Sequence, residues 1–187
     1  RALVVIAALL VSIWLSSQAS TDLLTNDSAQ YVSTARNIVR GEGLSTSIRY
    51  YEQQHQHELP APQTSWPPAF PAALASMSLI GLDPEQAAWL VPLIALIASA
   101  LLCFQIARAC GSSDAAAATA TILWLLSAEA WLAVLRGLSE TQFILLTLFS
   151  VWLLLHSTGR RWPHLWIAMA GLVAAAAFLT RYAGVAF

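Results

Sequence analysis

The sequence contains no lysine, and only 10% of its 187 residues are charged. Nine arginines and ten acidic residues give a net charge of −1, and the arginines are scattered along the chain rather than clustered. A protein without a basic surface lacks the electrostatic means to hold the phosphate backbone of a nucleic acid. Nucleic acid is therefore not an expected partner.

Cysteine is also scarce, since Cys103 and Cys110 are the only two in the chain. Both lie in one apolar run, seven positions apart. In a helix this spacing separates them by about 10 Å along the axis, which exceeds the roughly 7 Å between Cα atoms that a disulfide tolerates. We expect no disulfide and interpret both side chains as packing residues.

Apolar sequence, in contrast, is abundant: 58% of the residues are hydrophobic and the mean hydropathy is +0.64. Several runs approach the roughly 20 residues that a helix needs to cross a bilayer. The composition predicts an all-α fold, namely a polytopic membrane helix bundle that contacts membrane lipids. The expected spans are residues 2–17, 86–107, 115–134, 141–157 and 164–180.

Residues 68–82 form a sixth apolar stretch, which is short and begins around Pro67, Pro68 and Pro71. Because proline is tolerated in the first turn of a helix, we expect a short helix that lies in the membrane interface or re-enters the membrane. It is not expected to cross.

The distribution of arginine supports this choice. If residues 68–82 do not cross, Arg108, Arg160 and Arg161 fall on the side opposite the long polar loop of residues 18–85. The positive-inside rule assigns the arginine side to the cytoplasm. The loop is therefore expected outside, on the periplasmic side of a multi-pass protein of the bacterial inner membrane.

The ends of the chain carry two further expectations. Residues 2–17 are followed by small residues that would suit a signal-peptide cleavage site, but with more spans downstream we interpret them as an uncleaved first helix. The chain begins at Arg1 and stops at Phe187 within an apolar run. We expect it to be the N-terminal part of a longer, single transmembrane domain.

Within the outer loop, residues 27–40 predict an amphipathic helix lying along the membrane surface, because apolar residues recur there at three- and four-residue steps. Asn26 or Asp27 is expected to cap its start, and Gly41 and Gly43 to stop it. A carboxylate near the interface can also act as a general base toward a hydroxyl or an amine. Residue spacing alone leaves both roles open for Asp27.

Three ionisable residues, Arg136, Glu140 and Arg181, lie at the ends of apolar runs on the expected outer side. Charges at this depth are costly unless they pair or face a cavity. Arg136 and Glu140 are four positions apart and would pair on one helix face. The alternatives are interfacial charges that reach toward water, or arginines that bind the phosphate of a lipid-borne substrate.

The polar loop offers weaker candidates. His55 and His57, with Glu52 and Glu58, match no specific metal-binding spacing, so we expect no metal site there. Trp66, beside a pair of prolines, is a candidate for lining a groove for an acceptor or a lipid.

Several short motifs follow one another in a characteristic order after the first apolar run. They are Asp27 with Tyr31 and Ala35, Gly41-Glu42-Gly43, Trp66-Pro67-Pro68-Ala69-Phe70-Pro71, Leu138-Ser139-Glu140-Thr141 and Leu179-Thr180-Arg181-Tyr182. Across essentially the whole chain, their order resembles the N-terminal part of GT-C class membrane glycosyltransferases. The branch is the one that includes dolichyl-phosphate-mannose protein mannosyltransferases and bacterial lipid A aminoarabinose transferases.

This resemblance implies that a sugar passes, with inversion, from a polyprenyl-phosphate donor to a lipid, glycan or protein acceptor. In that family an aspartate of the first outer loop is the catalytic base, and its position falls on Asp27. The remaining candidates for binding the substrate or its phosphate are Arg136, Glu140, Arg181, Tyr31 and Trp66. No cofactor is required, although a divalent metal can assist at the phosphate.

One departure narrows the expectation, because Ser28 stands where the protein mannosyltransferases have glutamate. It argues against protein O-mannosylation and leaves the acceptor open. The alternatives are a non-enzymatic multi-pass protein, such as a transporter or a polysaccharide-export subunit, and an enzyme that ligates lipid-linked oligosaccharide. Charges collected at span ends rather than at the bilayer midplane favour an enzyme over a transporter.

Overall fold

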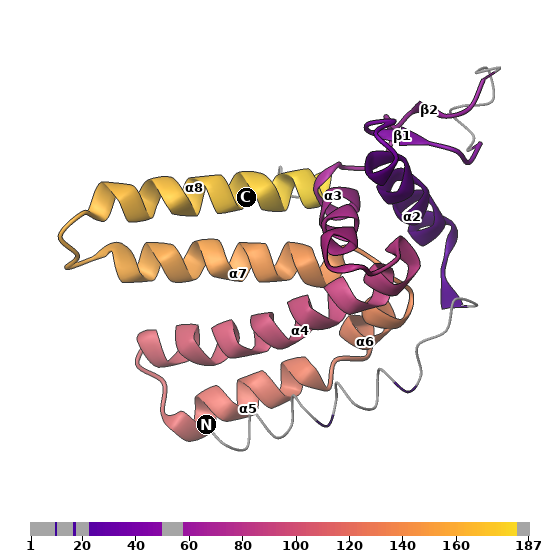
Figure 1. The fold of residues 1–187 in the computed structure, drawn as a ribbon. Helices are drawn as coiled ribbons and strands as arrows, with labels where there is room; N and C mark the ends of the chain where they lie inside the picture. The colour runs from indigo at the N-terminus through magenta and orange to yellow at the C-terminus, as the bar shows by residue number, and fades with distance from the viewer. Residues whose placement is uncertain (1–9, 11–16, 18–22, 50–57, 183–187) are drawn as a thin grey trace.

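The structure is a computed structural model that describes residues 10, 17, 23–49 and 58–182. Most of these residues are helical, as the all-α prediction requires (Figure 1). The expected first span, residues 2–17, lies outside them except for its residues 10 and 17. The elements are α2 (Asn26–Val39), β1 (Ser45–Thr46), β2 (Ala61–Pro62), α3 (Ala69–Ser76), η3 (Met77–Ile80), α4 (Pro84–Ala109), α5 (Asp114–Leu125), α6 (Ala128–Leu135), α7 (Glu140–Ser157) and α8 (Pro163–Thr180).

Helices α4, α7 and α8 are each long and apolar enough to cross a membrane. They agree with the expected spans 86–107, 141–157 and 164–180. The three helices lie side by side, and α7 and α8 form an antiparallel hairpin (Figure 1). Pro84 and Pro163 occupy the first turns of α4 and α8, where proline costs no helical hydrogen bond.

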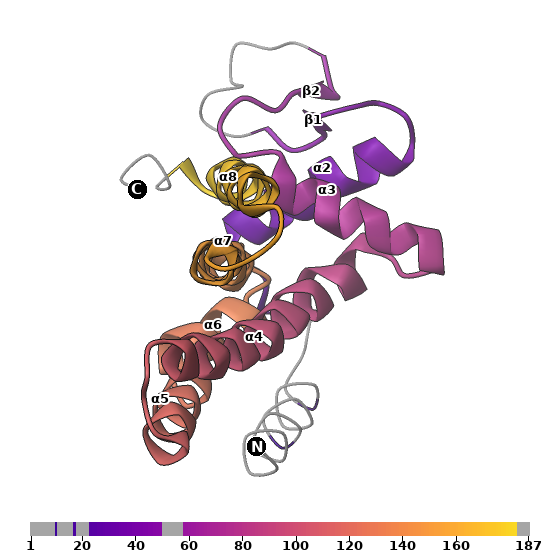
Figure 2. The ribbon, with the colours of Figure 1, turned by 90° about the vertical axis from the view of Figure 1, so that its left-hand side faces the viewer.

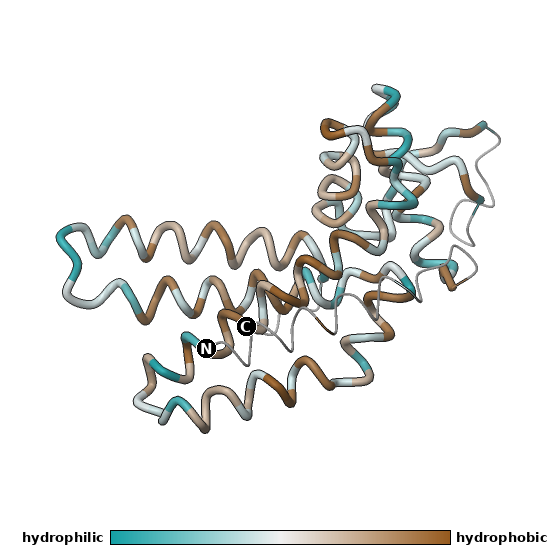
Figure 3. Tube along the Cα trace, turned by 60° about the horizontal axis from the view of Figure 1, so that its bottom comes forward, coloured by the Kyte–Doolittle hydropathy of each residue, from teal (hydrophilic) through white to brown (hydrophobic). Residues whose placement is uncertain are grey.

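Polar residues concentrate at the two ends of these helices (Figure 3). The α4–α5 and α7–α8 turns, which carry the arginines expected on the cytoplasmic side, lie at one end (Figure 1). Helices α2 and α3 and the β1–β2 ribbon lie at the opposite end, which we call the outer end. Residues 68–82 thus lie at one end of the long helices and do not run along their length (Figure 1).

The expected span over residues 115–134 is wrong as a single helix, because the structure divides it into α5 and α6, bent by 46°. Ser127 lies at the break, and its side chain accepts a hydrogen bond from the Ala130 backbone N–H and so caps α6. The Trp131 indole N–H donates to the Leu125 carbonyl oxygen. These bonds satisfy backbone groups that the break releases, which explains how a segment without proline or glycine bends.

The expected cap of α2 is also wrong, since Thr25 holds that position instead of Asn26 or Asp27. The Ser28 backbone N–H donates to the Thr25 hydroxyl at 3.3 Å, and the Thr25 N–H donates to the Ser28 hydroxyl at 3.2 Å. This reciprocal pair is a capping box. Asp27 is consequently free of the capping role.

Helix α2 packs its apolar side against α3 and α4. Tyr31, Val32 and Ala35 are buried together with Phe70 and Leu74 of α3. The rings of Tyr31 and Phe70 meet edge to face, with centroids 4.9 Å apart and planes at 83°, which is a favourable aromatic geometry. This cluster fixes the position of α2 on the outer end.

The polar side of α2 is covered as well, by the antiparallel ribbon of β1 and β2. The Thr46 hydroxyl donates to Oε1 of Gln30 at 2.7 Å, and the Ser47 N–H donates to the Ser33 hydroxyl at 2.9 Å. The amphipathic pattern is present as expected, but the polar face is buried under the ribbon rather than open to water. Hydrogen bonds within the protein replace those to solvent.

Residues 68–82 form the expected short helix, α3, which continues as the 3-10 helix η3. Its axis crosses the outer end of α8 steeply instead of running alongside the long helices (Figures 1 and 2). It ends at Gly81 with φ +82°, just as α2 ends before Gly41 with φ +80°. Glycine adopts this left-handed conformation without steric penalty.

We predict that Phe70→Ala lowers the free energy of unfolding by about 3–5 kcal/mol, because a fully buried ring is replaced by a cavity. Thermal or denaturant unfolding of the purified protein in detergent measures it. Leu44→Ala, at an exposed position, is the control and should change stability by less than about 0.5 kcal/mol. Equal effects of the two changes would show that the α2–α3 contact contributes little.

Candidate functional site

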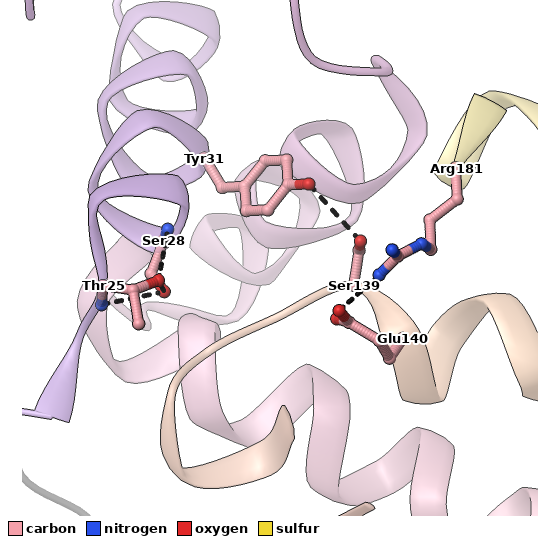
Figure 4. Close-up of polar contacts among 6 residues, drawn as sticks. All are labelled: Thr25, Ser28, Tyr31, Ser139, Glu140 and Arg181. Atoms are coloured by element: carbon pink, nitrogen blue, oxygen red, sulfur yellow. Dashed lines mark hydrogen bonds and ion pairs between the residues drawn. The ribbon is translucent and has the colours of Figure 1, made fainter. Parts of the chain in front are cut away.

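Three of the sequence candidates meet where α2, α7 and α8 come together at the outer end (Figure 4). Tyr31 extends from α2, Glu140 begins α7, and Arg181 follows α8. Glu140 and Arg181 form an ion pair through Oε1 and Nη1. The Tyr31 hydroxyl lies 3.4 Å from the hydroxyl of Ser139. Segments far apart in the sequence thus contribute to one polar cluster.

The expected pair between Arg136 and Glu140 is wrong. Helix α6 ends before Arg136, the chain turns at Gly137 with φ +64°, and α7 begins only at Glu140, so the two residues share no helix face. A Cβ at Gly137 would lie 3.0 Å from the Ala88 carbonyl oxygen, which means that this turn packs directly on α4. Glu140 pairs with Arg181 instead, and no ion pair joins the Arg136 guanidinium to a described residue.

Arg136 and Glu140 nevertheless line the same cavity, which has a volume of about 170 Å³ and lies between α5, α6 and α7. Trp124 and Glu129 line it too. The Trp124 indole N–H donates to the Ser99 hydroxyl of α4 at 2.8 Å, so its ring is held in place. An arginine, two carboxylates and an aromatic ring in one concave site suit a ligand with phosphate or hydroxyl groups.

Polar atoms at the start of α7 lack hydrogen-bond partners among the described residues. They are Oε2 of Glu140, Oγ1 of Thr141 and Oε1 of Gln142. Thr141 is fully buried and contributes to the wall of the same cavity. A buried polar group without a partner costs about 1–3 kcal/mol. Hydrogen-bonding groups of a ligand at the start of α7 would therefore satisfy polar atoms that have no partner among the described residues.

Asp27 lies exposed on the first turn of α2, and no hydrogen bond or ion pair joins it to a described residue. It is not among the residues that line the cavity of Arg136 and Glu140. Its charge nevertheless acts on the Tyr31 hydroxyl, as do the charges of Glu140 and Arg181. Asp27 thus belongs to the electrostatic surroundings of the cluster without forming a contact within it.

The Tyr31 hydroxyl has a raised pKa. Burial is the largest cause, because it disfavours the phenolate. The hydrogen bond with Ser139 opposes the rise, the carboxylates of Asp27 and Glu140 add to it, and Arg181 lowers it. Tyr31 is therefore a neutral hydrogen-bonding group at physiological pH.

Sequence reasoning assigned no role to Ser139, which belongs to the cluster, or to Ser28, which lies beside it on α2 (Figure 4). Ser28 is fully buried, and its hydroxyl donates to the Arg136 carbonyl oxygen at the end of α6. It therefore links the start of α2 to the cavity wall as well as capping the helix. The Thr25-x-x-Ser28 spacing could have predicted the capping box. No sequence pattern predicts the hydrogen bond from Ser28 to the Arg136 carbonyl oxygen.

Trp66, the last of the candidates, is half-buried and packs against the hydrophobic cluster of Tyr31 and Phe70. The three cavities described for this structure do not include it in their walls. The structure thus gives Trp66 a packing position beside the cluster.

Metal ligation was not expected in the polar loop. No group of three or more His, Cys, Asp or Glu side chains close enough to hold an ion occurs within the described part of the chain. Glu52, His55 and His57 lie outside that part, while Glu58 is described and exposed.

No protein-family model, curated protein or solved structure matches this chain.

We predict that Gly137→Ala destabilises the protein by at least about 1 kcal/mol more than Gly159→Ala. Both glycines have positive φ, +64° and +77°, so both substitutions carry the left-handed penalty of roughly 1–2 kcal/mol. Only at Gly137 would the new methyl group also press on the Ala88 carbonyl oxygen, whereas nothing lies within 4 Å at Gly159. Unfolding in detergent measures the difference, and equal losses would contradict the close packing of this turn on α4.

The raised pKa of Tyr31 predicts a loss of stability at alkaline pH. The folded state holds the phenolic proton more tightly than the unfolded state, so the contribution is complete below about pH 10 and falls as pH rises above it. Tyr31→Phe should make the free energy of unfolding less dependent on pH between about 9.5 and 11. Tyr182→Phe, at an exposed position, is the control and should keep the wild-type slope. An unchanged slope in Tyr31→Phe would refute the assignment.

Proposed function

We propose that this chain forms part of a multi-pass membrane glycosyltransferase, with its outer end on the periplasmic side of a bacterial inner membrane. The enzyme moves a sugar from a polyprenyl-phosphate donor to an acceptor with inversion at the anomeric carbon. The observation that carries the proposal is the polar cluster of Tyr31, Glu140 and Arg181, whose Tyr31 hydroxyl also feels the charge of the exposed Asp27 carboxylate. The segment that carries Asp27 and Tyr31 lies more than a hundred positions before Glu140 and Arg181 in the sequence.

Asp27 is the proposed general base. It is exposed on the first turn of α2, where the positive end of the helix dipole favours a carboxylate. No described side chain forms a hydrogen bond or an ion pair with it. The acceptor oxygen or nitrogen forms a bond to the anomeric carbon from the face opposite the phosphate. Its proton passes to Asp27, and the bond between the anomeric carbon and the phosphate oxygen breaks.

The leaving polyprenyl phosphate receives the electron pair of that bond and must be stabilised as its charge grows. Arg136 suits this role better than Arg181, because Arg181 is already paired with Glu140. Arg136 also lines the cavity between α5, α6 and α7, and α7 is one of the helices long and apolar enough to cross a membrane. In this position a guanidinium can donate two hydrogen bonds to one phosphate.

Glu140 is the proposed sugar-binding carboxylate. Its Oε1 is held by Arg181, and its Oε2 has no hydrogen-bond partner among the described residues. A sugar hydroxyl would supply the missing donor. Since the ion pair restrains the carboxylate, Glu140 is a less suitable proton acceptor than the unpaired Asp27.

The second candidate function is transport, and the bend between α5 and α6 favours it. Broken helices line the substrate paths of many transporters, and their ends bind substrates or ions. Here the break lies at Ser127, and Arg136 and Glu129 of the α6 segment line a cavity. A transporter would move a solute without consuming a lipid-linked sugar, which separates the two functions experimentally.

The test is a transfer assay in membranes that contain the full-length protein. Polyprenyl-phosphate mannose and polyprenyl-phosphate aminoarabinose serve as donors, and release of polyprenyl phosphate is measured. We expect turnover by the wild type and a fall of about 10²–10⁴-fold in Asp27→Asn, the usual contribution of a general base. Glu42→Gln, at an exposed position in the same loop, should retain wild-type turnover.

Equal turnover of Asp27→Asn and wild type, with both proteins inserted and folded, would refute the proposed mechanism. Absence of turnover with either donor, together with solute movement across sealed vesicles, would favour the transporter.

A further inference from the structure

Two further cavities lie beside α2, the larger at its last turn and the smaller along its length from Leu24 to Arg40. Their volumes are about 480 and 400 Å³, within the range of roughly 300–1,000 Å³ that is typical of ligand sites. Arg36, Arg40 and Glu85 line both of them. The arginines belong to the end of α2, and Glu85 belongs to the first turn of α4.

The charges of this region do not all cancel. Arg36 forms an ion pair with Glu85 and is neutralised by it. Arg40 and Asp83 both line the larger cavity, and neither makes an ion pair with a described residue. The cavity therefore presents one cation and one anion that no ion pair among the described residues neutralises, although Asp83 also caps α4, and its net charge is close to zero.

The neighbouring surface is unusually apolar. Leu79 and Ile80 are 88% and 72% exposed, and they lie in the chain between Ser78 and Gly81, which line the larger cavity. Val39, also in the lining, is exposed. Exposed apolar side chains beside a polar cavity are typical of a surface that meets lipid. The α3–η3 helix that carries them lies across the ends of the long apolar helices (Figure 2).

We propose that this cavity binds the headgroup of a zwitterionic phospholipid. Arg40 holds the phosphate through charge-assisted hydrogen bonds, Asp83 faces the ammonium group, and the acyl chains run along Leu79 and Ile80. An anionic headgroup would satisfy Arg40 but leave Asp83 facing a phosphate, and a soluble zwitterion would leave the apolar side chains in water. The proposal requires the chain to lie in a membrane and does not depend on sugar transfer.

The experiment measures lipid retention by native mass spectrometry of the full-length protein. Micelles contain equal amounts of phosphatidylethanolamine, phosphatidylcholine and phosphatidylglycerol. We expect the wild type to retain the two zwitterionic lipids in preference to the anionic one. In Arg40→Ala their retention should fall by about tenfold or more, the usual effect of removing a charged hydrogen-bond donor. Arg49→Gln, an exposed arginine outside both cavities, is the matched control and should behave as wild type.

Asp83→Asn tests the ammonium contact. Asp83 is the N-cap of α4, and asparagine is an equally good N-cap, so the helix start is preserved. Retention should shift toward phosphatidylglycerol, because the repulsion between Asp83 and an anionic headgroup is removed.

Three results would overturn the proposal. The first is a wild-type preference for phosphatidylglycerol, which needs no variant to observe. The second is unchanged lipid retention in both Arg40→Ala and Asp83→Asn. The third is displacement of bound lipid by free phosphoethanolamine at equal concentration, which would identify a site for soluble ligands.

Discussion

Burial of α2 on both of its faces determines the form of the outer end. One face packs its aromatic and aliphatic residues onto α3 and α4, and the other forms hydrogen bonds with the β1–β2 ribbon. A helix fixed on two sides has little freedom to rotate or to slide, because protein interiors are close-packed. Asp27, Tyr31 and the arginines of the last turn therefore keep fixed positions relative to α4, α7 and α8, although α2 precedes these helices by many residues.

The long helices and the glycine stops were predictable from the sequence because they depend on local properties. Apolar runs fix α4, α7 and α8, and Gly41 ends α2 by a conformation that it alone adopts easily. The predictions that were wrong depend on competition between neighbouring residues or on contacts between distant parts of the fold. Thr25 displaced two good capping residues by forming a reciprocal pair. The bend at Ser127 depends on Trp131 bonding to a carbonyl, which no periodicity reveals.

In the candidate site, too, features that depend on local sequence were predicted and those that depend on long-range contacts were not. Sequence reasoning selected Glu140 and Arg181 from their positions at the ends of apolar runs and Tyr31 from the family resemblance, and the structure brings the three together. It misjudged the partner of Glu140, since the choice between Arg136 and Arg181 depends on the turn at Gly137 and on α8 lying beside α7. Arg181 is consequently engaged in an ion pair, whereas Arg136 lines the cavity without an ion-pair partner among the described residues.

The complete burial of Ser28 has a steric consequence for which side chains can stand beside Asp27. Its hydroxyl fits between the Thr25 cap and the Arg136 carbonyl oxygen, and a longer acidic side chain at this position would have to displace α6 or unwind the first turn of α2. An acidic pair on adjacent residues is therefore incompatible with this packing. The second carboxylate that acts on the cluster comes from another helix, as Glu140, and so the two acidic groups can be altered independently of one another.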